Sequence, residues 1–538
     1  MERHIWRIVD SIQHINITAL NTQRILSHNQ YEYLPNMMKD IAQNMPKMVA
    51  TLCKYTDMAF WMFIKNNSQV CHKDVVNVLS ENQALAEFYV EILAALLKCY
   101  MLLQMTYMVQ TVNDLGNFND PADQLRESFT YNVTTIQNYV IFELKNASRA
   151  VWACDPDDFN DPDSYIEITR FYQGIVENEI NLNPEAKCQQ TCEEYTETKH
   201  YHCAEDSFCD HLTDPLLKSK LICNGTILNC RHLDSSFNIC PAEESSARRY
   251  NFLEYDDGSA LGGESNCNRL HVVRANSWWS WFVHCSNCFC YCDEPGIQSD
   301  RYFSLRSVVS NTNENKVISG VGFTKVNRII QLKISERELL PNGTFSQIDV
   351  TNMADQSFWR TSKEFSIDDY DVEEGVDYHT LSWFNRSIDL DTVIDDARVV
   401  TGVRFRVVNS HIRLEVRVTN FNYQTGKLID IQRSEWLYNK NSTEKKLLEL
   451  QYPDRSTRSK QKSIPIHGKN HYINFQSTDM NDASQSTVPF LDSHLVESQK
   501  PLAGVGLYYK TQFGYGGFIA AKLIVFDASL DITPINNF

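Results

Sequence analysis

The feature that most restricts how this chain folds is a repeat in its C-terminal half. Residues 317–334 read VISGVGFTKVNRIIQLKI and residues 399–416 read VVTGVRFRVVNSHIRLEV, identical at 8 of 18 positions without gaps. In both copies an asparagine, Asn327 or Asn409, follows the shared glycine by seven residues. A third copy begins at Pro501 as PLAGVGLYYK and then inserts TQFGYGGF before IAAKLIVF. Such self-similarity indicates one supersecondary unit used three times.

Each copy predicts a β-hairpin with one buried face. In the second copy, apolar and polar residues alternate on both sides of Asn409, which is the period of a half-buried strand. A glycine opens each copy (Gly320, Gly402 and Gly504), where a tight bend or close backbone approach is expected. Three equivalent hairpins predict pseudo-threefold packing, as in a β-prism or a β-trefoil-like body. A β-sandwich built by duplication is the alternative.

Cysteines are concentrated in one segment. Twelve of the 16 fall within residues 188–292, and the last 246 residues contain none. A dense, even set is typical of a disulfide framework in an oxidising compartment, where bridges replace a poor core. We expect every cysteine to be disulfide-bonded, in pairings that the sequence does not reveal. They are Cys53, Cys71, Cys99, Cys154, Cys188, Cys192, Cys203, Cys209, Cys223, Cys230, Cys240, Cys267, Cys285, Cys288, Cys290 and Cys292.

Glycosylation signals agree with an extracellular location. Eight Asn-x-Ser/Thr sequons are spread over the chain, which favours passage through the secretory pathway. The residues are Asn16, Asn66, Asn132, Asn146, Asn224, Asn342, Asn385 and Asn441. The opening MERHIWRIVDSIQHI lacks the apolar core of a signal peptide, so we expect a signal sequence to be missing from this record.

The chain is expected to be a multidomain α + β protein in three parts. A helical bundle covers 1–180, because residues 84–115 and 124–151 are rich in helix formers and 164–180 resume helical spacing. Residues 84–115 are apolar on nearly every face, as in a helix buried at the centre of a bundle. A disulfide-rich domain covers 181–295. The repetitive all-β domain, β-prism-like or a sandwich, covers 296–538.

Composition excludes some partners. The net charge of −18 disfavours nucleic acid and anionic lipid, both of which need a basic surface. The longest uncharged apolar stretch, Cys99–Asn113, has 15 residues, fewer than the roughly 18–20 that cross a bilayer. We therefore expect no transmembrane segment. Nothing in the sequence indicates the oligomeric state.

Two segments contain residues that could bind a metal ion. Cys285, Cys288, Cys290 and Cys292, with His284, have spacings compatible with zinc, but disulfides are favoured. The aspartates and asparagine of residues 155–163 concentrate oxygen ligands for calcium. They lack the EF-hand glycine and distal glutamate, so a solvated acidic linker is favoured. We expect no bound metal and no cofactor.

Catalytic motifs are absent from the sequence. It contains no G-x-S-x-G elbow, no H-E-x-x-H and no P-loop. We therefore expect no enzymatic activity, with an enzyme of unrecognised class as the remaining alternative.

Aromatic residues offer two platforms for sugar stacking. The first surrounds a glycine-rich insertion, expected at the surface because such loops rarely pack inside. Its residues are Tyr508, Tyr509, Phe513, Gly514, Tyr515, Gly516 and Gly517. The second is the tryptophan cluster, for which a small core beneath the disulfides is favoured. It comprises Trp278, Trp279 and Trp281.

These segments also carry resemblances. The cysteine-rich segment followed by GVGFTKVNRIIQLKI, VVTGVRFRVV, PLAGVGLYYK and GYGGFIAAKLIVFD resembles a family of uncharacterised secreted insect proteins, classified only as a domain of unknown function. The resemblance covers about residues 20–530. It implies an extracellular insect protein and transfers no activity or functional residue.

Two likenesses concern architecture only. The repeats look like the strand pairs of jacalin-type β-prism lectins, whose glycine-rich loops hold a sugar; Phe513–Gly517 would be the comparable loop. The spacing of about 80–100 residues between copies is longer than in those lectins. A helical bundle joined to a β-prism also resembles the plan of three-domain insecticidal crystal toxins.

Together these observations predict a secreted glycoprotein that binds a glycan or an extracellular protein through loops of its β domain. The first alternative is a membrane-active, pore-forming-like protein that uses the apolar helix of residues 84–115. The second is an enzyme of unrecognised class.

Overall fold

The chain divides into two compact units. The computed structural model describes residues 46–47, 49–51, 79–112, 116–189, 191–205, 207–233, 235–262, 272–280, 282–346, 359–440, 445–466 and 470–532. One unit comprises Met1–Val151 with Val525–Phe538, and the other comprises Trp152–Ile524. The cysteine-rich segment and the repeats thus share a unit, and a finer division into three parts stays a prediction.

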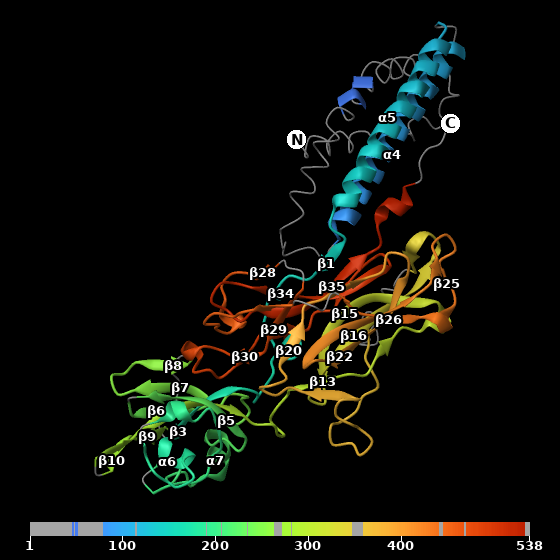
Figure 1. Cartoon of the computed structure of the whole chain (residues 1–538). Helices are drawn as coiled ribbons and strands as arrows, with labels where there is room; N and C mark the ends of the chain where they lie inside the picture. The colour runs from blue at the N-terminus through green and yellow to red at the C-terminus, as the bar shows by residue number, and fades with distance from the viewer. Residues whose placement is uncertain are drawn as a thin grey trace. The chain divides into compact units, whose positions relative to one another are not determined.

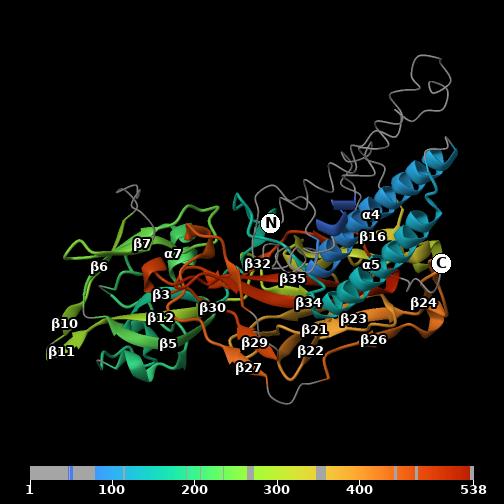
Figure 2. The same ribbon diagram turned by 90° about the horizontal axis from the view of Figure 1, so that it is seen from above.

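The helical unit is built on an antiparallel pair, α4 (Glu81–Val112) and α5 (Asn119–Asn146). The two helices lie side by side in both views (Figures 1 and 2). The Asn82 side chain ties their open end, because its Nδ2 donates to the Leu144 carbonyl at 2.9 Å. Apolar side chains of both helices form one buried core, so the two predicted helices are confirmed, each shifted a few residues towards the N-terminus.

One side of α4 is exposed, although the sequence predicted burial on nearly every face. The exposed apolar residues, here called the outer stripe, are Val90, Leu97, Met101, Met108 and Val112. From Ile92 to Val112 the only charged side chain is Lys98. By length and composition alone, α4 is apolar enough to cross a membrane. The absence of a transmembrane segment stays a prediction.

Residues 164–180, predicted to be helical, instead form strands. They contain β2 (Tyr165–Ile166), β3 (Gln173–Asn178) and the single turn α6 (Glu179–Leu182). Every residue of β3 is buried. A strand covered on both faces shows no alternation of polar and apolar residues, so its sequence did not distinguish it from a helix.

A four-stranded sheet organises the cysteine-rich segment. Its order is β3-β12-β5-β4, with β12 at Asn287–Asp293, β5 at Thr226–Leu233 and β4 at Glu197–Thr198. Beside it lies a second sheet, ordered β8-β7-β6-β9. Its strands are β6 (Phe237–Pro241), β7 (Tyr250–Tyr255), β8 (Ala260–Gly262) and β9 (Val273–Ala275).

Disulfides provide much of this core. Cys288, Cys290 and Cys292 alternate along β12, so their side chains share one face, and all three are fully buried. The disulfides are Cys188–Cys285, Cys192–Cys288, Cys203–Cys209, Cys223–Cys292 and Cys230–Cys290. The predicted disulfide framework is confirmed for this segment. The bridges do not replace an apolar core, however, because Phe237, Leu253 and Phe289 belong to a second buried cluster in the same segment.

The prediction that every cysteine is disulfide-bonded fails for Cys99, which is buried within α4 as a thiol. Its side chain belongs to the helical core, where a small apolar residue is needed and no second cysteine is offered by α5. Cys154 and Cys240 are disulfide-bonded. Cys53, Cys71 and Cys267 lie outside the described residues.

The repeats form three long hairpins. We call these hairpins and the strands that flank them the repeat body. The hairpins are β15–β16 (Lys316–Val326 and Ile329–Leu340), β22–β23 (Val399–Val408 and His411–Thr419) and β34–β35 (Leu502–Thr511 and Phe518–Val525). In the first two, the pairing register shifts at the residue before the shared glycine, Ser319 and Thr401. Equal bulges at equal positions show that the sequence repeat is a structural repeat.

Each hairpin is the centre of a sheet with the same strand order. A short strand pairs in parallel with the second strand of its own hairpin: β13 (Tyr302–Ser304), β20 (Ser387–Asp389) and β32 (Phe490–Asp492). An outer strand then covers each of these in antiparallel fashion: β19 (Tyr378–Thr380), β29 (His471–Asn474) and β2.

The three sheets exchange their last strands in a cycle. These strands are β14 (Val308–Val309), β21 (Thr392–Ile394) and β33 (Val496–Glu497). The first pairs with β22 of the second repeat, the second with β34 of the third, and the third with β15 of the first. The first strands of all three hairpins also contact one another. The repeats therefore close on themselves around a common core.

Candidate functional site

The third hairpin differs from the others at its turn. The first two hairpins turn through two residues in the left-handed region, at Asn327 and at Asn409 with their successors. In the third, residues 512–517 form a longer loop, with Gly514 at φ 81° and Gly517 at φ 65°. The insertion predicted as a surface loop is thus present at one end of the repeat body.

Main-chain hydrogen bonds hold this loop against a second segment. The Asp454 amide donates to the Gly514 carbonyl at 2.8 Å, and the Gly516 amide donates to the Asp454 carbonyl at 2.7 Å. A Cβ at Gly516 would lie 2.3 Å from the Val488 side chain, so no larger residue fits there. The loop is therefore ordered by its contacts.

Tyr508 and Tyr509, predicted to contact a ligand, are buried in β34. The Tyr508 hydroxyl donates to the Ala153 carbonyl at 2.9 Å, and the Tyr509 hydroxyl donates to the Gly516 carbonyl at 3.1 Å. Both roles are structural, because β34 is central and covered on both faces. Neither ring reaches the surface, and a binding role for these two residues stays a prediction.

Phe513 and Tyr452 are the aromatic residues that reach the surface here. Phe513, at the tip of the loop, is 96% exposed, and Tyr452 is 84% exposed. Asp454 and Tyr515 form a parallel bridge, and the two exposed rings each lie two residues before a bridged residue. Tyr452 was missed because it lies more than 50 residues from the loop in sequence; the only local signal was its turn-forming neighbour, Pro453.

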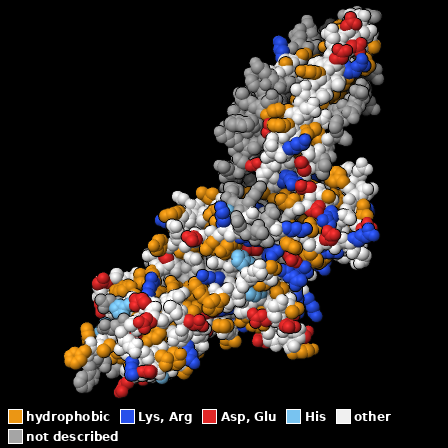
Figure 3. Space-filling model, in the orientation of Figure 1, with side chains coloured by type: hydrophobic (Ala, Val, Ile, Leu, Met, Phe, Trp, Pro, Cys, Tyr) orange, Lys and Arg blue, Asp and Glu red, His pale blue; other side chains and the backbone are white. Residues whose placement is uncertain are grey.

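The tryptophan cluster lies on a short hairpin, β10 (Trp278–Ser280) with β11 (Val283–Cys285). Trp279 is 68% exposed and Phe282, near the tip, is 92% exposed. Apolar side chains gather at this end of the molecule in the space-filling view (Figure 3). The favoured interpretation, a small core beneath the disulfides, is therefore wrong for Trp279. Trp281 lies outside the described residues.

Neither candidate metal site is available as predicted. Cys285, Cys288, Cys290 and Cys292 are all in disulfides. Asp155 is buried and pairs with Lys510 at 3.2 Å, while Asp161 pairs with Lys325 at 3.4 Å. Asp155 therefore departs from the predicted solvated linker, whereas the other oxygen-bearing residues of the segment are exposed as predicted: Asp157, Asp158, Asn160, Asp161 and Asp163.

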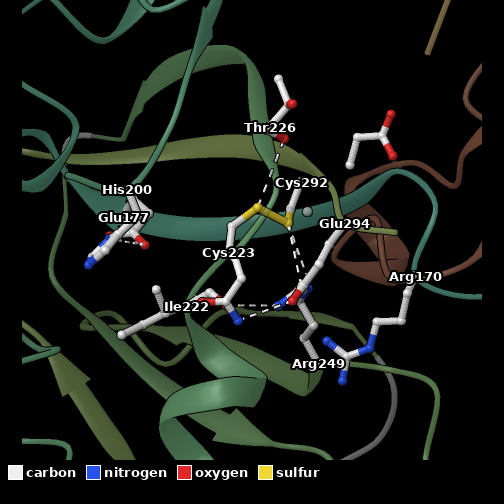
Figure 4. Close-up of a disulfide and its surroundings, with 12 residues drawn as sticks. Arg170, Glu177, His200, Ile222, Cys223, Thr226, Arg249, Cys292 and Glu294 are labelled. Carbon is white, nitrogen blue, oxygen red and sulfur yellow. Dashed lines mark hydrogen bonds and ion pairs between the residues drawn. A yellow bond between two sulfur atoms is a disulfide. The ribbon is translucent and has the colours of Figure 1, made fainter. Parts of the chain in front are cut away.

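A cluster of buried cations, which was not predicted from the sequence, lies beside the Cys223–Cys292 disulfide (Figure 4). Arg249, just before β7, is fully buried. Its Nη1 donates to the carbonyls of Lys220 and Ile222 at 2.8 and 3.3 Å. These carbonyls end the short helix α7 (Pro215–Leu221), where a cation is favoured. Its Nη2 contacts Glu294, which follows β12.

Two further cations lie close to Arg249. Arg170, just before β3, is 4% exposed, and Lys220 at the end of α7 is 8% exposed. Burial lowers the pKa of Arg170 to about 10, and repulsion from Arg249 contributes to the shift. Burial and then repulsion from Arg170 lower the pKa of Lys220 to about 8. No spacing links these residues, so only the fold brings them together.

Five sequons fall in the described part of the chain. Asn146, Asn224 and Asn342 are exposed, while Asn132 and Asn385 are half-buried. Asn16, Asn66 and Asn441 lie outside the described residues. Attachment of a glycan stays a prediction at every site.

Residues 68–334 match the domain of unknown function DUF4803. This span begins before α4 and ends within β16, so it covers the helical pair, the cysteine-rich segment and the first repeat hairpin. No curated protein matches the sequence.

Proposed function

We propose that this chain is a secreted, glycosylated binding protein of an insect family that recognises carbohydrate at one end of its repeat body. The five disulfides support the location, because they are typical of extracellular proteins. The match to DUF4803 suggests no reaction. Within the described residues no three His, Cys, Asp or Glu side chains form a metal-binding group.

The observation that carries the proposal is the pair of exposed rings at Phe513 and Tyr452. Aromatic faces stack on the C–H groups of sugars, and polar groups beside them set the orientation. Asp454, which orders the loop, also accepts from Arg458 Nη1 at 3.0 Å. Both of these polar side chains are partly exposed. A sugar stacked on the rings would find a carboxylate and a guanidinium within the same small area.

The cyclic strand exchange supports the comparison with β-prism lectins. In a β-prism, three sheets surround one axis and loops gather at its ends. Here the three sheets have one strand order, and only the third carries a long loop in place of a tight turn. We infer that the loop marks the end of the prism at which ligand binds.

A glycan array with the full-length protein tests this proposal. Phe513→Ala and Tyr452→Ala should each weaken binding of the best glycan about tenfold, the loss expected for one stacking partner. Phe384→Ala is the matched control, because that ring is also exposed but lies outside the loop. Unchanged binding by both loop variants, or no binding by the folded wild type, would sink the carbohydrate assignment.

A second candidate, membrane activity, is favoured by a different observation. The outer stripe of α4 is apolar, and the helix is long enough to cross a bilayer. Core helices of soluble proteins can also be this long and apolar, so membrane activity has to be measured directly. Dye release from phosphatidylcholine vesicles should occur with the wild type and be abolished by Met101→Lys. Thr135→Lys, at an exposed position of α5, is the control. Absence of leakage between pH 4 and pH 8 would contradict this function.

A further inference from the structure

The buried cation cluster contains more positive than negative charge. Arg170, Lys220 and Arg249 are each at least nine-tenths buried. Among the described residues the carboxylate that reaches them is Glu294. That carboxylate is already engaged, because it binds Arg249 and accepts from Asn224 Nδ2 at 3.1 Å. The exposed Glu244 and Glu243 attract Lys220 from the surface, and the effect of Glu244 exceeds the repulsion from Arg249. Among the described residues, however, no carboxylate forms an ion pair with Arg170.

Arg170 is the clearest case. No described residue accepts a hydrogen bond from its guanidinium, and its Nε is fully enclosed. Figure 4 shows this side chain extending towards Arg249. The backbone holds it there, because the Arg170 carbonyl accepts from Arg301 and its φ is 51°, in the left-handed region. An enclosed guanidinium nitrogen without an acceptor is destabilising.

Lys220 offers further N–H donors beside Arg170. Its ammonium carries three N–H groups, of which one donates to the Glu243 carbonyl. The others are free to serve a second acceptor. Together, Arg170 and Lys220 offer fixed donors of one sign in a setting that excludes most water, which is the chemistry of an anion site.

We propose that Arg170 and Lys220, backed by Arg249, bind a small inorganic anion of the halide class. The ligand must be small, because the three side chains expose almost no surface. It must be negative, because a water molecule would satisfy the donors and leave the excess charge. The bound anion joins α7 to the strands that begin after Arg170 and Arg249, and so stabilises the cysteine-rich part of the fold.

Anion-dependent thermal unfolding of the full-length protein tests the site, with sodium chloride exchanged for sodium gluconate at constant ionic strength. The wild-type midpoint should rise by roughly 2–4 °C from 1 to 200 mM chloride, as mass action requires for a ligand that binds only the folded state. Bromide should also raise the unfolding midpoint. Because bromide is larger than chloride, the size of its effect shows how tightly the site encloses the anion. Arg170→Met should remove the response.

Two features keep the test decisive. Arg170→Met should be more stable than the wild type in gluconate, since it deletes an uncompensated charge, whereas a merely structural arginine would give a less stable variant in every salt. Arg274→Met removes an exposed, paired arginine and should keep the chloride response. A wild-type midpoint independent of the anion, or equal responses of wild type and Arg170→Met, would overturn the proposal.

Discussion

Asp389 and Asp492 occupy the same position in the second and third repeats, and the first repeat has Ser304 there. Each aspartate is buried and is contacted by a lysine and a histidine. His411 Nδ1 lies 2.8 Å from Asp389, which also binds Lys445. His494 and Lys510 do the same for Asp492. One repeat position thus became an ion-pair site in two copies.

These contacts predict acid sensitivity. Burial favours the neutral form of Asp389, but hydrogen bonds from His411 and Lys445 outweigh it and lower its pKa below 3.8. A lowered folded pKa contributes stability above the unfolded pKa, and that stability is lost as the pH falls through the folded value. Asp389→Asn should therefore destabilise by about 3–5 kcal/mol at pH 7, and by much less at pH 3.

Urea unfolding of both proteins at the two pH values measures the difference. The exposed Asp368→Asn is the control and should match the wild type at each. A deficit of Asp389→Asn that is as large at pH 3 as at pH 7 would show that packing, and not charge, explains its effect.

Lys220 makes the proposed anion site dependent on pH. Its pKa is lowered to about 8, so its charge is lost as the pH rises from 7 to 9, whereas that of Arg170, lowered to about 10, is retained. The other charged groups that face Lys220 are Arg249, Glu243 and Glu244. The chloride-induced rise in melting temperature should shrink between pH 7 and pH 9, and Lys220→Met should show a small rise at both. A wild-type rise that is equal at both pH values would contradict this.

At the scale of the element, the two tight turns show how local chemistry sets the hairpins. Both turn residues have positive φ, 50° and 69° at Asn327 and Arg328, and 52° and 65° at Asn409 and Ser410. Asparagine tolerates this region, whereas arginine and serine do so only with strain. The shared asparagine of the repeat is therefore explained by backbone conformation.

Glycine at the second turn position should relieve that strain. Ser410→Gly is expected to raise the free energy of unfolding by about 1 kcal/mol, measured by chemical denaturation. Arg328→Gly should gain less, because it also loses the hydrogen bond that Arg328 Nη2 donates to the Ser299 carbonyl. Ser459→Gly is the control, because Ser459 has φ −67°, outside the left-handed region that favours glycine. This change should be neutral or destabilising. A loss of stability in both turn variants would show that side-chain contacts outweigh backbone strain.

At the scale of the whole molecule, the five described disulfides and the long helices α4 and α5 belong to different units. All five described bridges lie within Trp152–Ile524. Four of them close loops of 60 to 97 residues, each stabilising by about 2–5 kcal/mol. Reduction should lower the calorimetric transition of this unit by tens of degrees and leave that of the helical unit unchanged. Equal shifts of both transitions would contradict the division into units.

Several features could be predicted from sequence because they are local. The hairpins follow from alternation with a period of two, and the turns from an asparagine at a fixed distance from the glycine. The disulfide core follows from the density of cysteines. The helices α4 and α5 follow from long runs of helix formers without glycine, and the one proline, Pro121, lies in the first turn of α5, where it is tolerated.

Other features depended on contacts between distant residues. Which cysteines pair, why Cys99 stays a thiol, and why Tyr508 is buried while Phe513 is exposed are decided by what packs against each side chain. The strands at 165–178 are stabilised by partners more than 100 residues away. The buried cations of Arg170, Lys220 and Arg249 have no local signature, because burial and electrostatic repulsion arise only when the chain brings them together.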